Sequence, residues 1–72
     1  MTLQEGAPGS TYTVQSLALP TALERRLEAL GVIEGTPITV LRKKPHGAMV
    51  ISVRGSRFAI GYQIAAHIGV AG

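Results

Sequence analysis

Hydrophobic residues recur with helical spacing between residues 21 and 31. Three leucines lie at positions i, i+4 and i+7, which form one face of a helix: Leu23, Leu27 and Leu30. Thr21 and Glu24 have the spacing of a capping box, and Gly31 stands where a left-handed residue would end the helix. A helix with a single leucine stripe cannot bury itself, so we expect it to pack closely against a sheet.

Short alternating segments on both sides of this helix predict β-strands. Residues 11–17 (TYTVQSL) and residues 37–43 (PITVLRK) each alternate between apolar and polar side chains. Leu3 is the only strongly apolar residue of the first ten after the initial methionine. We therefore expect a lead-in turn that Leu3 anchors to the fold, followed by strand, helix and strand.

The second half of the chain predicts a hairpin meander. Residues 48–53 place Met49, Ile51 and Val53 on one face, and a tight turn at Gly55 leads to a fourth strand near residues 58–60. Residues 62–68 have room for only a turn or two of helix, and Val70 marks a last short strand. Four or five short strands with one helix predict a mainly β domain, and a partly open barrel hides the strand edges.

Length and composition favour a binding module over an enzyme. The 72 residues form a single domain, 1–72, with 46% hydrophobic and only 15% charged residues, which indicates a folded chain. A core of this size supplies only about 3–5 kcal/mol of net stability, which leaves little room for a deep catalytic pocket. The chain has no cysteine, no signal peptide and no bilayer-length apolar run, so we expect a cytoplasmic protein without membrane insertion.

No set of residues predicts catalysis, a cofactor or a metal site. The chain has no aspartate, no Ser-His-acid combination and no phosphate-binding loop. Its potential metal ligands are two histidines and four glutamates, and only Glu24 and Glu28 share an element at a useful spacing. We interpret that pair as solvated charge on an exposed helix face.

The net charge of +3, with an isoelectric point near 10, favours an anionic partner. Such a partner is an acidic protein face, nucleic acid or the inner membrane surface, and the alternative is that the charge only keeps the domain soluble. The candidate partner-binding residues are the basic side chains and one apolar side chain of the third strand: Arg25, Arg26, Arg42, Lys43, Lys44, Arg54, Arg57 and Met49.

The order of these features resembles the FeoA family, the small accessory proteins of bacterial ferrous iron uptake. An arginine-rich helix ends in Leu30-Gly31, a Pro45–Gly47 turn joins two strands, and residues 65–70 near the end of the chain read AAHIGV, as in that family. The resemblance implies an SH3-like, partly open β-barrel with the helix between strands one and two and a short terminal helical turn. It also implies a cytoplasmic protein without enzymatic activity that acts on FeoB, the ferrous iron permease with a cytosolic GTP-binding domain.

The resemblance suggests how the basic residues act. Arg42–Lys44 and Arg54–Arg57 would line one rim that docks on an acidic face, and Arg54 or Arg57 could reach a bound nucleotide as an arginine finger. The apolar residues of the third strand, Met49 among them, would serve weak self-association or a partner peptide if exposed.

Two alternatives remain for the function. Small basic barrels bind nucleic acid, but base stacking needs exposed aromatic side chains. This chain has only Tyr12, Phe58 and Tyr62, and we expect Phe58 in the core, so nucleic acid is a weaker prediction. The other alternative is a stand-alone relative of the SH3-like module of metal-dependent transcription regulators.

Overall fold

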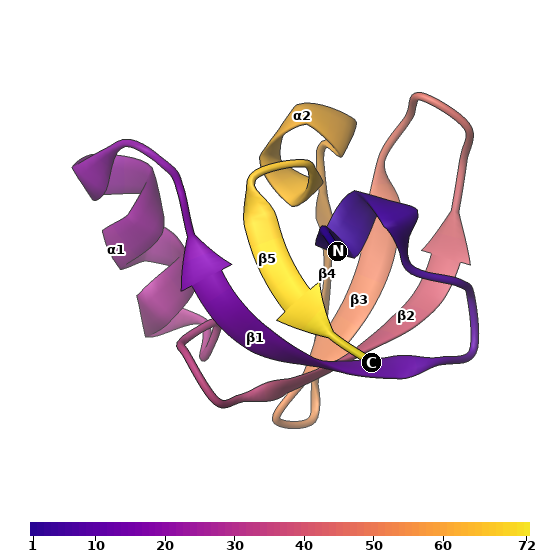
Figure 1. Cartoon of the computed structure of the whole chain (residues 1–72), viewed down its shortest axis with the longest axis horizontal. Helices are drawn as coiled ribbons and strands as arrows, with labels where there is room; N and C mark the ends of the chain where they lie inside the picture. The colour runs from indigo at the N-terminus through magenta and orange to yellow at the C-terminus, as the bar shows by residue number, and fades with distance from the viewer.

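The chain folds as a strongly bent sheet with one helix at its flank, and the computed structural model describes all 72 residues. Figure 1 shows the elements, whose bounds are: η1, a 3-10 helix, Leu3–Glu5; β1, Thr11–Leu17; α1, Thr21–Ala29; β2, Pro37–Lys43; β3, Met49–Val53; β4, Ser56–Ile60; α2, Tyr62–Ala65; and β5, Ile68–Ala71. The predicted strands, the helix after the first strand and the terminal helical turn are all confirmed. No helix has the length and apolarity needed to cross a bilayer.

The five strands form one antiparallel sheet in the order β4-β3-β2-β1-β5. Strands β2, β3 and β4 are the predicted meander, and β1 bridges it to β5. Bulges in β1 and β2 increase the local bend of the sheet, which lets it curl into a partly open barrel. The sheet therefore has two edge strands, β4 and β5.

The chain ends cover one of these edges. Thr2 forms an isolated bridge with Gly69, and the backbone N–H of Val70 donates to the carbonyl of Met1 over 2.9 Å. Leu3, at the start of η1, is fully buried, as its isolation in a polar lead-in predicts. The N-terminal segment thus protects the outer edge of β5 from pairing with another chain.

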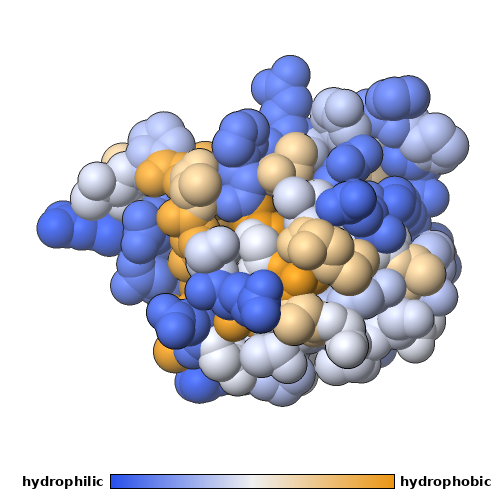
Figure 2. All heavy atoms as spheres, in the orientation of Figure 1, coloured by the Kyte–Doolittle hydropathy of each residue, from blue (hydrophilic) through white to orange (hydrophobic).

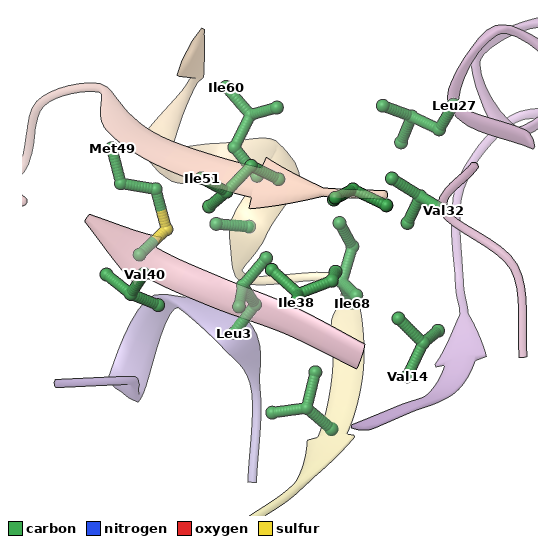
Figure 3. Packing of buried hydrophobic residues seen from close by; sticks show 13 residues of the cluster. Leu3, Val14, Leu27, Val32, Ile38, Val40, Met49, Ile51, Ile60 and Ile68 are labelled. Atoms are coloured by element: carbon green, nitrogen blue, oxygen red, sulfur yellow. The ribbon is translucent and has the colours of Figure 1, made fainter. Parts of the chain in front are cut away.

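The core fills the inside of the bent sheet. Alternate residues of each strand point inward, and β3 follows this pattern throughout, with Met49, Ile51 and Val53 all buried. In Figure 3 the side chains of Leu3, Ile38 and Ile68 converge from three separate elements. Phe58 is only half-buried and packs at the margin of this core, so its prediction as a core residue is correct only in part.

Helix α1 differs from the prediction at its start and in its packing. Pro20 occupies the N-cap position without a side-chain cap, so Thr21 lies inside the helix and the predicted capping box does not form. Only Leu27 of the leucine stripe is buried, whereas Leu30 is 47% exposed. Figure 1 shows α1 beside β1, at one end of the molecule. Because only one residue of the helix is buried, the expected close packing against the sheet is wrong.

The end of α1 follows the prediction. Gly31 has φ +99°, its N–H donates to the carbonyl of Glu28, and the N–H of Val32 donates to that of Leu27. These two bonds are the Schellman pattern, which satisfies carbonyls that the last helical turn leaves free. Leu27, the single buried residue of the helix, lies beside Val32 in Figure 3, so the turn also positions this contact.

A capping interaction does occur, at η1. The Glu5 carboxylate accepts a hydrogen bond from the Thr2 backbone N–H at 2.7 Å and from the Thr2 hydroxyl at 3.2 Å. The backbone hydrogen bond, followed by the hydroxyl, lowers the pKa of Glu5 below its ordinary value of 4.5. Thr2 and Glu5 have the same Thr-x-x-Glu spacing as Thr21 and Glu24. The sequence predicted no capping box there, because no long helix follows.

Candidate functional site

The candidate basic residues fall into separate groups on the molecule. Lys43 pairs with Met49 at one end of β3, whereas Arg54 lies in the turn at the other end of that strand. Arg25 and Arg26 are exposed on α1, which lies on the opposite flank from the β2–β3 turn in Figure 1. The predicted single rim of Arg42–Lys44 with Arg54–Arg57 is therefore wrong.

Two basic side chains nevertheless share one face of the sheet. The register places Arg42, Val50 and Ala59 in one row across β2, β3 and β4. Thr39, Ser52 and Arg57 form the next row. None of the side chains in these rows is fully buried, and those of Arg42, Arg57 and Ala59 are exposed. We call these two rows the outer face: Arg42, Val50, Ala59, Thr39, Ser52 and Arg57.

Two other basic side chains contact the chain itself. The Lys43 ammonium donates to the backbone carbonyl of Gly6 over 3.2 Å, which ties β2 to the N-terminal segment. The Arg54 side chain lies over Gly31, where an added β-carbon would stand 3.2 Å from its Cδ atom. Both residues thus support loops of this fold.

Met49 is buried, with 2% of its surface exposed, and belongs to the core. Its prediction as a partner-binding residue is wrong, because the inward face of β3 meets the barrel interior. Val50, its neighbour on the outer face, is half-buried and is the apolar residue of β3 that a partner can reach.

A shallow hollow separates the β2–β3 turn from α2. It has a volume of about 430 Å³ and is lined by His46, Gly47, Ala48, Gly61, Tyr62, Gln63 and Ile64. His46 adopts a left-handed conformation (φ 56°) in the turn, and its ring meets that of Tyr62 edge to face, with centroids 5.4 Å apart. Lys43 and Lys44 line a smaller hollow of about 110 Å³ against the same aromatic pair. Figure 2 shows hydrophilic side chains gathered where this turn projects.

A third hollow lies between α1 and β1 and is acidic. It has a volume of about 230 Å³, and its lining residues are Ser16, Leu17, Glu24, Glu28, Ile33 and Glu34. No group of three or more His, Cys, Asp or Glu side chains in the structure is arranged to hold a metal ion. The sequence suggested the Glu24–Glu28 pair, but the loop that brings Glu34 beside it could be placed only by the fold.

The charge is divided between the two halves of the chain. All four glutamates lie at or before Glu34, whereas five of the seven Lys and Arg residues follow it. Because residues 37–60 form β2, β3 and β4, this division leaves the meander with positive charge alone, whereas α1 carries two glutamates and two arginines. This signal is present in the sequence, but the basic residues are dispersed and do not form one run, which makes it easy to miss.

A model of the FeoA domain matches residues 1–72, the whole chain. The chain belongs to the FeoA family. This family is associated with ferrous iron transport. A search of curated proteins gives no significant match.

Solved FeoA structures share the fold of the chain. A crystal structure of an iron uptake regulatory protein (FeoA) is 34% identical, with a TM-score of 0.91 over 99% of this chain and 95% of the other. FeoA of Stenotrophomonas maltophilia, a procaryotic SH3 domain protein crystallised in complex with zinc, is 29% identical, with a TM-score of 0.81 over 97% and 88% of the two chains. The predicted SH3-like fold is therefore confirmed.

A manganese-dependent transcriptional repressor is also similar in structure. Its identity to this chain is 19%, with a TM-score of 0.87 over 99% of this chain but only 40% of the repressor. The likeness shows a shared fold.

Proposed function

We propose that the chain is a cytoplasmic accessory protein of ferrous iron uptake that acts by contact with the cytosolic GTP-binding domain of a FeoB-type permease. The match of the whole chain to the FeoA family carries this proposal. The accessory protein binds through its surface and supplies no catalytic group. GTP hydrolysis and ion passage then belong to the permease.

The outer face is the surface we assign to this contact. Arg42 and Arg57 are exposed there on neighbouring rows, and the strands that carry them contain no acidic residue. A positive sheet face of this kind favours an acidic partner surface and speeds the encounter with it. Lys44, exposed directly after β2, extends the same charge toward the turn.

Titration of isotope-labelled protein with the cytosolic domain of the cognate permease, with and without GTP, tests the proposal. We expect NMR shift changes on β2, β3 and β4. The double reversal Arg42→Glu with Arg57→Glu should weaken binding about tenfold or more, because charges at the contact set the encounter rate and the specificity.

The matched control is Arg25→Glu with Arg26→Glu on α1, which changes the net charge equally. We expect about threefold weakening or less, since only the general attraction between the molecules is reduced. Lys43 is not used, because its reversal would also break the bond to Gly6. Equal loss in both double variants, or shifts confined to α1, would contradict the assigned surface, and no shifts at all would contradict the contact.

A second candidate function rests on the aromatic pair beside the β2–β3 turn. Tyr62 and His46 lie next to Lys43 and Lys44, so one base could stack where a phosphate is also attracted. Tyr12 does not contribute, because its hydroxyl accepts the Ala7 N–H at 2.7 Å within the N-terminal segment. Titration with an oligothymidylate tests this candidate, which predicts shifts at Tyr62 that vanish in Tyr62→Ala.

A further inference from the structure

The outer edge of β4 is open to another strand. Val53 and Ser56 flank a two-residue turn, in which Arg54 (φ 50°) and Gly55 (φ 83°) both have positive φ, as in a type I′ hairpin. These flanking residues form a hydrogen-bonded pair, so bonded and non-bonded pairs alternate along the ladder from that point.

The alternation fixes which backbone groups point outward. Arg57 and Ala59 occupy the non-bonded positions opposite Ser52 and Val50, so their N–H and C=O groups point away from β3. No other backbone or side-chain group of the chain hydrogen-bonds to them, and both residues are exposed. Two donors and two acceptors thus line an edge with the spacing that a further strand requires.

The other edge of the sheet is treated differently. The N-terminal segment covers β5 through the Thr2–Gly69 bridge and the Val70–Met1 hydrogen bond. No equivalent segment pairs with β4, which lies at the end of the strand order. The chain therefore leaves one specific edge available.

Charge indicates what the open edge accepts. Arg57 lies on β4 itself, Arg42 lies on the same outer face, and no acidic residue occurs after Glu34. An extended segment with acidic side chains on that face would pair with Arg57, whereas a second copy would bring another β4 with its own Arg57. The complementary occupant is an acidic strand from a different protein.

We propose that β4 binds an extended acidic segment of a partner protein by strand addition, with the outward groups of Arg57 and Ala59 making the backbone hydrogen bonds. Strand addition takes affinity from the main chain and specificity from side-chain pockets. The hollow lined by Gly61, Tyr62 and Ile64 lies directly beyond the end of β4 and offers such a pocket. The identity of this partner as the permease domain rests on the function proposed above.

Amide hydrogen exchange read by NMR tests the proposal at the atoms concerned. The first probe is a peptide of alternating glutamate and valine, the control is the matched lysine and valine peptide, and the second probe is the cytosolic permease domain. Strand addition should slow exchange about tenfold or more at Arg57 and Ala59, because their N–H groups gain acceptors. Phe58 and Ile60, whose N–H groups already face β3, serve as internal references.

Two variants separate backbone pairing from charge. Ala59→Pro removes an outward N–H at a place where an edge strand tolerates proline, and Ala59→Thr is its control with the N–H retained. We expect binding of the acidic peptide to fall about tenfold in Ala59→Pro and to remain in Ala59→Thr. Arg57→Gln should weaken binding less, since it keeps every backbone group.

The outcomes distinguish strand addition at β4 from the accessory function proposed above, and they test whether the occupant of the edge is acidic. Binding of the permease domain without protection at Arg57 and Ala59 would overturn strand addition and leave the accessory function standing. Protection by the acidic peptide without any binding of the permease domain would support strand addition and contradict that partner. Binding of neither probe, equal binding of the lysine peptide, or protection that rises with the concentration of the chain alone would overturn the acidic strand as occupant.

Discussion

Three residues with positive φ, His46, Arg54 and Gly31, shape the turns next to β3 and the end of α1. His46 and Arg54 both adopt positive φ although neither is glycine. His46 lies in the β2–β3 turn and Arg54 lies in the β3–β4 turn. Gly31 combines a φ of +99° with close contacts, since an added β-carbon would stand 3.3 Å from Val53 Cγ1 and 3.2 Å from Arg54 Cδ. The end of α1 therefore packs against the β3–β4 turn at Gly31, where there is no space for a side chain.

Substitution of Gly31 separates these two effects when paired with Gly35. Gly31→Ala should lower the free energy of unfolding by about 2 kcal/mol or more, because strain at positive φ adds to the tight contacts. Gly35 has a similar φ of +88° but open space around it, so Gly35→Ala should cost only about 1 kcal/mol. Urea denaturation measures both, and equal losses would show that the contacts with Val53 and Arg54 carry no cost.

At the scale of elements, the sheet is stabilised by many buried side chains, whereas α1 is attached through a single one. Strands β2, β3 and β5 each give two or three buried residues to one shared core, while the nine residues of α1 give only Leu27. Leu30 (47% exposed) and Ile33 (36% exposed) leave apolar surface at the end of the helix. Figure 2 shows hydrophobic side chains at this flank of the molecule. We infer that α1 is the element most readily released from the fold.

Alanine substitution along the leucine stripe tests this view. Leu27→Ala should lower the free energy of unfolding by about 2–3 kcal/mol, because it removes the contact with Val32 and leaves a cavity. Leu30→Ala should change it by less than about 0.5 kcal/mol, because its side chain is largely solvated. Thermal unfolding followed by circular dichroism measures the difference, and equal losses would mean that α1 packs as closely as its periodicity predicted.

At the scale of the whole molecule, the two chain ends close the fold. Leu3 is fully buried and Thr2 pairs with Gly69 of β5, so the N-terminal and C-terminal segments together cover one side of the core. A domain of this size retains only about 3–5 kcal/mol of stability, so the loss of one such contact is a large fraction of the total.

Leu3→Ala should therefore remove about 2–4 kcal/mol and leave a substantial unfolded population at 37 °C. Gln4→Ala, one residue further along η1, is the control, because Gln4 is a half-buried polar side chain. Amide exchange at Val70, whose N–H donates to Met1, should accelerate in Leu3→Ala only. An unchanged rate at Val70 would show that the N-terminal segment is not held by Leu3.

Local patterns predicted most of the fold because strand alternation and turn residues act over a few positions. Residues 11–17 and 37–43 form the strands expected of them, and Gly55 occupies the expected hairpin turn. The predicted capping box of α1 does not form, because Pro20 takes the N-cap position and Thr21 lies inside the helix. The same Thr-x-x-Glu spacing does form a capping box at η1, where Thr2 is the N-cap and the Glu5 carboxylate accepts its backbone N–H.

The candidate site depended on contacts between distant segments. The two basic groups looked equivalent in sequence, yet strand register sets Arg42 and Arg57 on one face while Lys43 turns toward Gly6. A bulge near Leu41 shifts that register, and no residue pattern around Leu41 predicts the bulge. The charge division between the halves was readable beforehand, but its meaning depended on which strands are neighbours.

The element order, the mainly β class and the positive charge of the meander could be read from the sequence, because they follow from short-range periodicity and from composition. The family was indicated by the order of its motifs along the chain, which resembles the FeoA family. The burial of Met49, the position of α1 at the flank, and the covered edge of β5 beside the open edge of β4 became known from the folded structure. The physical reason is that burial and edge protection depend on which segments meet, and that choice is made by the packing of the whole chain at once.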